Sequence, residues 1–141
     1  MRPETGDKRQ ESQGIGRRFR SIKAWQRADD LVARVYEATR AFPNEERYGL
    51  TSQMRRSAVS VAANIVEGAS RRSRQEYLQF LFVAKASLNE LSYYVCLARR
   101  LAYVMEPPFN ELNELCEETA RTLYGLIQSV SKETANKVSH V

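Results

Sequence analysis

An unbroken heptad of apolar residues in the second half of the chain restricts the fold more than any other feature. Its members follow one another at alternating steps of four and three: Tyr77, Leu81, Ala84, Leu88, Leu91, Val95, Ala98 and Ala102. A 3.5-residue repeat is typical of long helices that pack at shallow, left-handed angles. The repeat therefore predicts one helix of about 30 residues, roughly 45 Å long. We expect Pro107-Pro108 to end this helix.

Three further stretches show helical periodicity, and none has the alternation of a strand. Residues 22–39 recur at steps of three and four behind Ser21, a predicted N-cap, and residues 109–130 repeat the heptad. Ser73-Arg74-Gln75-Glu76 has the form of a capping box at the start of the long helix. Four helices joined by short connections favour an all-α, antiparallel up-down-up-down four-helix bundle.

The helix expected between Thr51 and Gly68 carries two apolar stripes. The first consists of Met54, Ala58, Val61 and Ile65, and the second of Val59, Ala62, Ala63 and Val66. Two stripes predict a helix that is covered on two sides. Gly68, which has no Cβ, is expected to end the helix in a left-handed conformation.

The length of 141 residues suits a single domain with one core. We expect a flexible basic arm at 1–20, the four-helix bundle at 21–132 and a frayed tail at 133–141. No apolar run approaches the roughly 20 residues that span a bilayer, and the N-terminus has no secretory signal. A cytoplasmic protein is therefore expected, with Cys96 and Cys116 as reduced residues that face the core.

A polar stripe interrupts the apolar pattern of the second helix, and a shorter one interrupts the third. Together they predict an internal polar network that sets helix register: Arg56, Ser60, Asn64, Glu67, Ser87 and Glu90. A buried glutamate requires a charged or hydrogen-bonding partner, and Arg56 is a candidate. Two alternatives stay open: a stripe that is simply solvated, and a small-molecule or catalytic pocket built from Arg56, Asn64, Glu67, Ser87 and Glu90.

The sequence offers no catalytic constellation. The single histidine, His140, is next to the last residue, neither cysteine has metal-ligand spacing, and no Glu-x-x-His pair or glycine-rich phosphate loop occurs. We therefore expect no enzyme, no cofactor and no metal site.

Positive charge is concentrated in the first half of the chain. Residues 1–74 hold 16 Lys and Arg against 9 Asp and Glu, whereas residues 75–141 hold 6 against 8. The arginines expected to contact phosphates lie toward the two ends of the second helix: Arg55, Arg56, Arg71, Arg72 and Arg74. Such segments bind nucleic acid without reading its sequence, although head-to-tail packing of subunits and a solvated surface are the alternatives.

The residues between 21 and 130 also resemble a known family. The resemblance rests on Trp25-Gln26-Arg27-Ala28, Phe42-Pro43, Tyr48 to Arg56, Ser60 to Gly68, Arg71-Arg72-Ser73 and Ala84 to Leu91. In these stretches the chain is similar to the bacterial four-helix bundle family, also called the 23S rRNA intervening-sequence protein or S23 family. Ala62 and Ala86 depart from its pattern, which usually has proline and glycine there.

The resemblance implies a four-helix bundle assembled as a ring-like homo-oligomer, with a pentamer as the expected state. It also implies RNA or other nucleic acid as a partner and no established enzymatic activity. The family's recurrent residues correspond here to Arg55, Arg56, Asn64, Glu67, Gly68, Arg71, Ser87 and Glu90. The alternative function is a structural or scaffold protein that binds other proteins and no nucleic acid.

Overall fold

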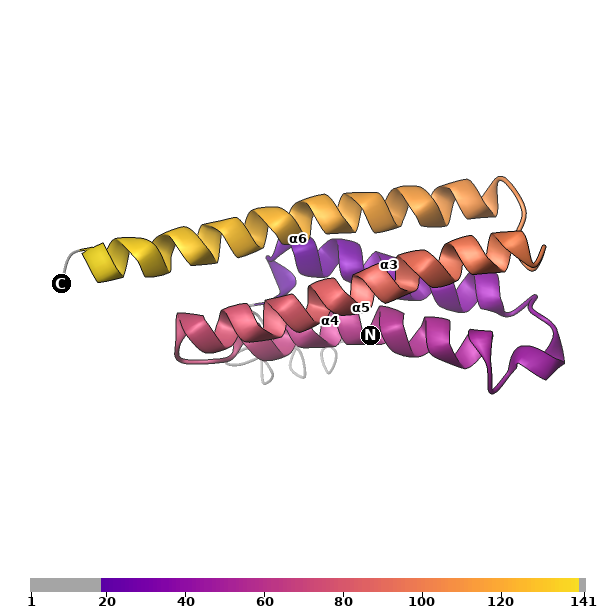
Figure 1. Ribbon diagram of the computed structural model, residues 1–141, viewed down its shortest axis with the longest axis horizontal. Helices are drawn as coiled ribbons and strands as arrows, with labels where there is room; N and C mark the ends of the chain where they lie inside the picture. Colours follow the sequence, from indigo (N-terminus) through magenta and orange to yellow (C-terminus); the bar gives the residue numbers. More distant parts are fainter. Residues whose placement is uncertain (1–18, 140–141) are drawn as a thin grey trace, which may run out of the picture.

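Four α-helices make up most of the chain in the computed structural model, which describes residues 19–139. They are α3 (Lys23–Thr39), α4 (Leu50–Ala69), α5 (Arg74–Arg100) and α6 (Pro108–Ser139), and a short 3-10 helix, η1 (Asn44–Glu46), follows α3. The helices run along the long axis of the molecule, and α6 extends beyond α4 and α5 at one end (Figure 1). No strand occurs within residues 19–139, so the prediction of an all-α chain with four helices is confirmed.

Each helix packs against two of the others. In the described part of the chain α4 and α6 both contact α3 and α5 but do not contact each other. Arg27 pairs with Glu118 and Arg34 pairs with Glu111, so the beginning of α3 lies beside the middle of α6 and its later turns lie beside the start of α6. The four helices therefore enclose one core between them.

The heptad of α5 supplies the centre of that core. Six of its eight members are at most 2% exposed: Leu81, Ala84, Leu88, Leu91, Val95 and Ala98. Burying a leucine side chain of this kind stabilises a fold by about 1.5–3 kcal/mol. In α6 the predicted heptad is followed as far as Leu123, after which Ile127 is buried in place of Leu126. This one-residue shift is expected because a straight helix has 3.6 residues per turn rather than 3.5.

The beginning of α5 agrees with the sequence, and its end does not. The backbone N–H of Glu76 donates to Ser73 Oγ at 3.1 Å, so Ser73 caps the helix as predicted. However, α5 ends at Arg100, well before Pro107, because Ala102 adopts a left-handed φ of 62°. The N–H groups of Ala102 and Tyr103 donate to the carbonyls of Arg99 and Ala98, which is a Schellman cap. Ala102 is therefore exposed and does not belong to the core.

Gly68 does not end α4 in the predicted left-handed conformation. The helix continues through Gly68 to Ala69, and none of the described glycines has a positive φ. Gly68 is instead buried against α5, where an added Cβ would lie 2.9 Å from Phe80 Cβ and 2.9 Å from Tyr77 Cδ1. The glycine is needed for the close approach of two helices and not for a turn.

The second apolar stripe of α4 is only partly covered. Ala62 is buried and Val66 is half-buried, but Val59 is 41% exposed and Ala63 is also exposed. In a single chain α3 and α5 both pack against α4, as predicted, but part of the second stripe is left uncovered. Val59 and Ala63 form an apolar strip that faces outward, away from the core.

Two smaller predictions need correction. Ile22, and not Ser21, occupies the N-cap of α3, and no side chain caps this helix. Of the two cysteines only Cys116 faces the core, whereas Cys96 is exposed. Burial raises the pKa of the Cys116 thiol to about 11.

Two of the predicted segments lie partly outside the described residues. Residues 1–18 of the basic arm are not described, and of its remainder Phe19 packs its ring on Trp25, with centroids 4.8 Å apart. The predicted tail, residues 133–141, takes in the last turns of α6 and two residues that are not described, His140 among them. None of the described helices is long and apolar enough to cross a membrane.

Candidate nucleic-acid interface

A basic groove lies at the corner where α3 leads into α4. Three arginines, two tyrosines and two hydroxyl side chains line it, with a volume of about 490 Å³: Arg47, Arg55, Arg56, Tyr36, Tyr48, Thr51, Ser52 and Val59. No carboxylate is among the lining residues, so the positive charge of the groove is not neutralised from within its walls. This combination suits an anionic ligand that also carries aromatic groups.

Arg55 forms a fixed wall of this groove. Its Nε donates to Thr39 Oγ1 at 2.8 Å, and its guanidinium lies over the Tyr36 ring, 4.6 Å from the centroid. Both partners belong to α3, so Arg55 also connects α4 to α3. The stacked ring restricts the motion of the guanidinium.

Arg56 and Arg47 are the more available cations of the groove. Arg56 is exposed and has no ion-pair or hydrogen-bond partner among the residues that the structure describes. Arg47 is exposed as well, and its guanidinium lies 5.6 Å from the centroid of the Tyr48 ring. Neither side chain forms an ion pair with a carboxylate of the described residues, so both can contact phosphate oxygens.

Glu46 holds the loop that carries Arg47 and Tyr48. One oxygen of its carboxylate accepts from the backbone N–H of Leu50 at 3.0 Å, and the other accepts from the Tyr103 hydroxyl at 2.8 Å. These two hydrogen bonds lower the pKa of Glu46, and the bond to the carboxylate raises the pKa of Tyr103. The carboxylate therefore caps α4 and ties the loop to the α5–α6 connection.

The other predicted arginines lie at the opposite end of α4. Sixteen residues separate Arg55 from Arg71, which corresponds to about 24 Å along a helix. Arg71 forms an ion pair with Glu67 at 2.8 Å and lies over the Phe80 ring, 4.7 Å from its centroid. Arg72 is exposed, and Arg74 is the half-buried first residue of α5. The five arginines thus form two separate groups.

The predicted polar network is smaller than expected. Ser60 Oγ and Ser87 Oγ lie 2.7 Å apart across α4 and α5, and Asn64 Nδ2 donates to the carbonyl of Ser60 at 2.8 Å and to its Oγ at 3.1 Å. The charged members, Arg56, Glu67 and Glu90, are exposed on the single chain. Glu67 pairs with Arg71 rather than with Arg56.

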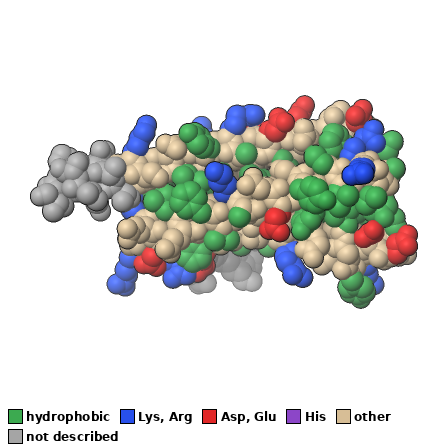
Figure 2. Space-filling view, viewed as in Figure 1, with side chains coloured by type: hydrophobic (Ala, Val, Ile, Leu, Met, Phe, Trp, Pro, Cys, Tyr) green, Lys and Arg blue, Asp and Glu red, His purple; other side chains and the backbone are tan. Residues whose placement is uncertain are grey.

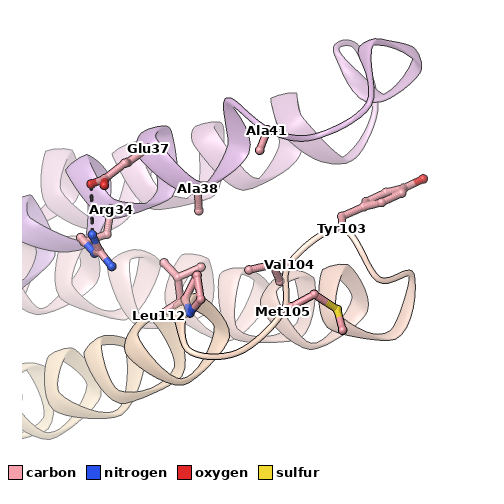
Figure 3. A pocket seen from close by; sticks show the side chains of 9 residues that line it. Arg34, Glu37, Ala38, Ala41, Tyr103, Val104, Met105 and Leu112 are labelled. Atoms are coloured by element: carbon pink, nitrogen blue, oxygen red, sulfur yellow. Dashed lines mark hydrogen bonds and ion pairs between the residues drawn. The ribbon is translucent and has the colours of Figure 1, made fainter.

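Two other hollows lack the features of a charged site. The first, of about 280 Å³, lies between α3 and the α5–α6 connection, where Val104, Met105 and Leu112 lie opposite Ala38 (Figure 3). Its arginine, Arg34, is neutralised by Glu37 and Glu111. The second, of about 210 Å³, lies between α5 and α6 and is mainly apolar.

The surface as a whole mixes charges. On the face shown in Figure 2 basic and acidic side chains are interspersed, and hydrophobic side chains gather toward the end that carries the α3–α4 and α5–α6 connections. Within the described residues no group of three or more His, Cys, Asp or Glu could hold a metal ion. The basic groove is therefore the candidate functional site.

Sequence reasoning missed most of this groove. It found Arg55 and Arg56 but not Arg47, Tyr36 or Tyr48. Helical periodicity does not describe the turn through η1, which places Arg47 and Tyr48 beside the first turns of α4. The one available signal was the stretch from Tyr48 to Arg56, already noted for the resemblance.

The fold and the groove define an all-α protein of four helices with a basic, aromatic-lined surface. The chain belongs to the 23S rRNA-intervening sequence protein family, whose model matches residues 20–125. It is also similar to the crystal structure of a protein with unknown function from the S23 ribosomal protein family of Bacteroides thetaiotaomicron. The TM-score is 0.66 at 22% identity, over 74% of this chain and 97% of that chain, which supports the fold alone. None of the curated proteins matches the chain.

Proposed function

We propose that this protein is a non-enzymatic, oligomeric four-helix bundle of the cytoplasm that binds RNA or other nucleic acid through its arginine-rich surfaces. The observation that carries the proposal is the groove in which Arg47, Arg55 and Arg56 meet without an opposing carboxylate. A guanidinium group can donate two parallel hydrogen bonds to the oxygens of one phosphate, and binding releases the counterions of the nucleic acid. Membership of a family named for intervening sequences of 23S rRNA is compatible with an RNA ligand.

The bundle proposed here has an antiparallel up-down-up-down order. The pairing of Arg27 with Glu118 and of Arg34 with Glu111 supports this order for α3 and α6. The bond between Ser60 and Ser87 supports it for α4 and α5, because Gly68 further along α4 packs on residues that precede Ser87 in α5. The bundle proper spans 21–132, with the proposed basic arm at 1–20 and the tail at 133–141 on either side.

A ring-like homo-oligomer, with the pentamer as the expected state, accounts for the uncovered strip on α4. Val59, which also lines the basic groove, is 41% exposed and Val83 of α5 is 48% exposed, and a second copy of the chain packed here would remove both from water and border the groove. A ring also repeats the groove, so that several weak phosphate contacts act together on one strand. The charged residues Glu67 and Glu90 then lie near or within the interface, where they set the register of the copies.

Binding to a short fluorescein-labelled RNA, measured by fluorescence anisotropy over a range of salt concentrations, tests the ligand. The affinity is expected to fall steeply with salt, with a slope of about 0.7 for each phosphate contact on a single strand. Arg47→Ala with Arg56→Ala is expected to weaken binding several-fold and to reduce that slope by about one for each arginine that no longer reaches a phosphate. Arg56→Ala alone and Arg121→Ala on α6 each remove one positive charge, and Arg121 does not line the groove, so Arg121→Ala serves as the matched control for Arg56→Ala. Salt-independent behaviour, or no binding at low salt, contradicts the proposal.

The oligomer has its own test. Light scattering coupled to size exclusion is expected to show an assembly for the unaltered protein and smaller species for Val59→Glu with Val83→Glu. Tyr124→Glu introduces one such carboxylate on α6, which does not touch α4, and should leave the assembly intact. Equal masses for all three proteins contradict the proposed interface.

The second candidate function is a scaffold that binds other proteins and no nucleic acid, and the same exposed strip on α4 favours it. In this case Arg71→Ala with Arg72→Ala leaves partner binding intact, whereas Glu90→Ala disrupts the oligomer. The RNA titration above separates the two functions, since a scaffold shows no salt-dependent retention of RNA.

A further inference from the structure

Tyr48 is the most exposed of the large hydrophobic side chains in the described part of the chain, at 87%. It stands at the rim of the basic groove, on the loop between η1 and α4. We infer that Tyr48 is a stacking platform for an unpaired base, so that the groove takes single-stranded rather than double-stranded nucleic acid. This inference rests on the function proposed above and specifies its substrate class.

The ring of Tyr48 has one occupied face and one open face. The guanidinium of Arg47 lies over the ring at 5.6 Å from its centroid. Because the residue is 87% exposed, the opposite face is open to solvent and can receive a base. A base stacked there completes a sandwich with the tyrosine ring in the middle and the guanidinium on its far side.

The remaining lining of the groove suits the backbone of the same strand. Arg55 is held in place by Thr39 and Tyr36, whereas Arg56 is free of partners among the described residues. One fixed and one available guanidinium thus lie next to the stacking ring. Phosphate-binding cations beside an exposed aromatic are the two parts that sites for single strands combine.

A duplex cannot use the stacking part of this groove. In a double helix each base is covered above and below by its neighbours, so that no ring face is free for Tyr48. Exposing a base in a duplex requires free energy to break its pairing and stacking, whereas a single strand needs much less. Discrimination between the two forms therefore depends on Tyr48, whereas the arginines attract both.

The loop is also held in the conformation that stacking requires. The Glu46 carboxylate accepts hydrogen bonds from the N–H of Leu50, at the start of α4, and from the hydroxyl of Tyr103, on the α5–α6 connection. A Cβ on Gly49 would lie 2.6 Å from Glu46 Oε1. A platform that is already ordered loses little entropy on binding. The exposure of Tyr48 thus reflects a defined position of the loop.

Three fluorescein-labelled probes test the inference: a short RNA strand of mixed sequence, the same strand annealed to its complement, and an abasic strand of the same length. Tyr48→Ala is expected to weaken binding of the RNA strand by about 5- to 150-fold, the range for one stacked base. It should leave the affinity for the abasic strand and the salt slope unchanged, because the arginines still reach the phosphates. Tyr48→Phe should bind like the unaltered protein, since the ring remains.

Tyr124→Ala is the matched control, because Tyr124 is a 62% exposed tyrosine on α6 outside the groove. Unfolding temperatures of all variants verify that the fold is intact. The inference is overturned if Tyr48→Ala binds the strand as tightly as the unaltered protein does, or if the duplex binds as tightly as the single strand. Sensitivity to Arg56→Ala without sensitivity to Tyr48→Ala refutes the stacking alone, whereas no binding to any probe at low salt refutes the proposed function as well.

Discussion

Gly68 and Gly125 provide a pair of identical substitutions with opposite expected effects. Both lie within helices, so replacement by alanine should stabilise each helix by about 1 kcal/mol through helix propensity. At Gly125 an added Cβ meets nothing within 4 Å. Gly125→Ala is therefore expected to raise the free energy of unfolding by about 1 kcal/mol.

At Gly68 the same methyl group has no space. Its nearest neighbours are Phe80 Cβ and Tyr77 Cδ1, each at 2.9 Å, and the backbone oxygen of Tyr77 at 3.2 Å. None of these atoms is the end of a flexible side chain, so α4 and α5 must separate. Overpacking of this kind costs about 1–3 kcal/mol. Because the propensity gain is the same at both positions, Gly68→Ala should be less stable than Gly125→Ala by that amount.

Urea unfolding followed by circular dichroism measures the difference directly. All proteins are compared at one concentration, because association stabilises the folded state by mass action. For a chain of this length, 1 kcal/mol corresponds to roughly 3 °C in the unfolding temperature, which gives an independent check. Equal stability of the two variants would show that α4 and α5 do not approach as closely as the structure indicates, and would refute the reasoning.

Three further predictions concern other contacts. Because the folded-state pKa of Glu46 is lowered, its carboxylate stabilises the fold at pH values above its ordinary pKa of 4.5, and this stabilisation is lost as the pH falls through the folded-state pKa. In urea titrations at several pH values, Glu46→Gln should therefore reduce the loss of stability on the acid side. Ser60→Ala should cost about 1–3 kcal/mol by leaving the buried Ser87 hydroxyl unpaired, and adding Ser87→Ala should recover part of that loss in the same unfolding assay. In a thiol titration at mild alkaline pH, Cys96 should react in the native protein and Cys116 only after unfolding, because Cys116 is buried and its pKa is about 11; equal rates contradict this.

The apolar repeat was enough to predict the helices and most of the core. Leu81, Leu88 and Leu91 are buried as their spacing predicts, because in a bundle the position along a helix decides which face meets its neighbours. The repeat failed at Ala102, where the backbone turns left-handed at a residue other than glycine. Nothing in the pattern distinguishes this alanine from those that precede it, since the Schellman bonds depend on tertiary fit.

The candidate site was less predictable than the fold. Arg55 and Arg56 stood out by charge, but the groove needs Tyr36 from another helix and Tyr48 from a loop whose path periodicity does not describe. Apolar patterning was informative in a different way for Val59. It indicated that a second face of α4 requires cover, and a single chain leaves that face exposed.

Both oxygens of the Glu46 carboxylate are committed to the fold, which limits how this end of the molecule can diversify. A change at Glu46 would loosen α4 and the α5–α6 connection together. The side chains of Arg47 and Tyr48 have no such structural role, because they are exposed and do not pack against the core. New recognition properties could therefore arise by exchanging these two residues on an unchanged frame, which is how one fold comes to serve several ligands.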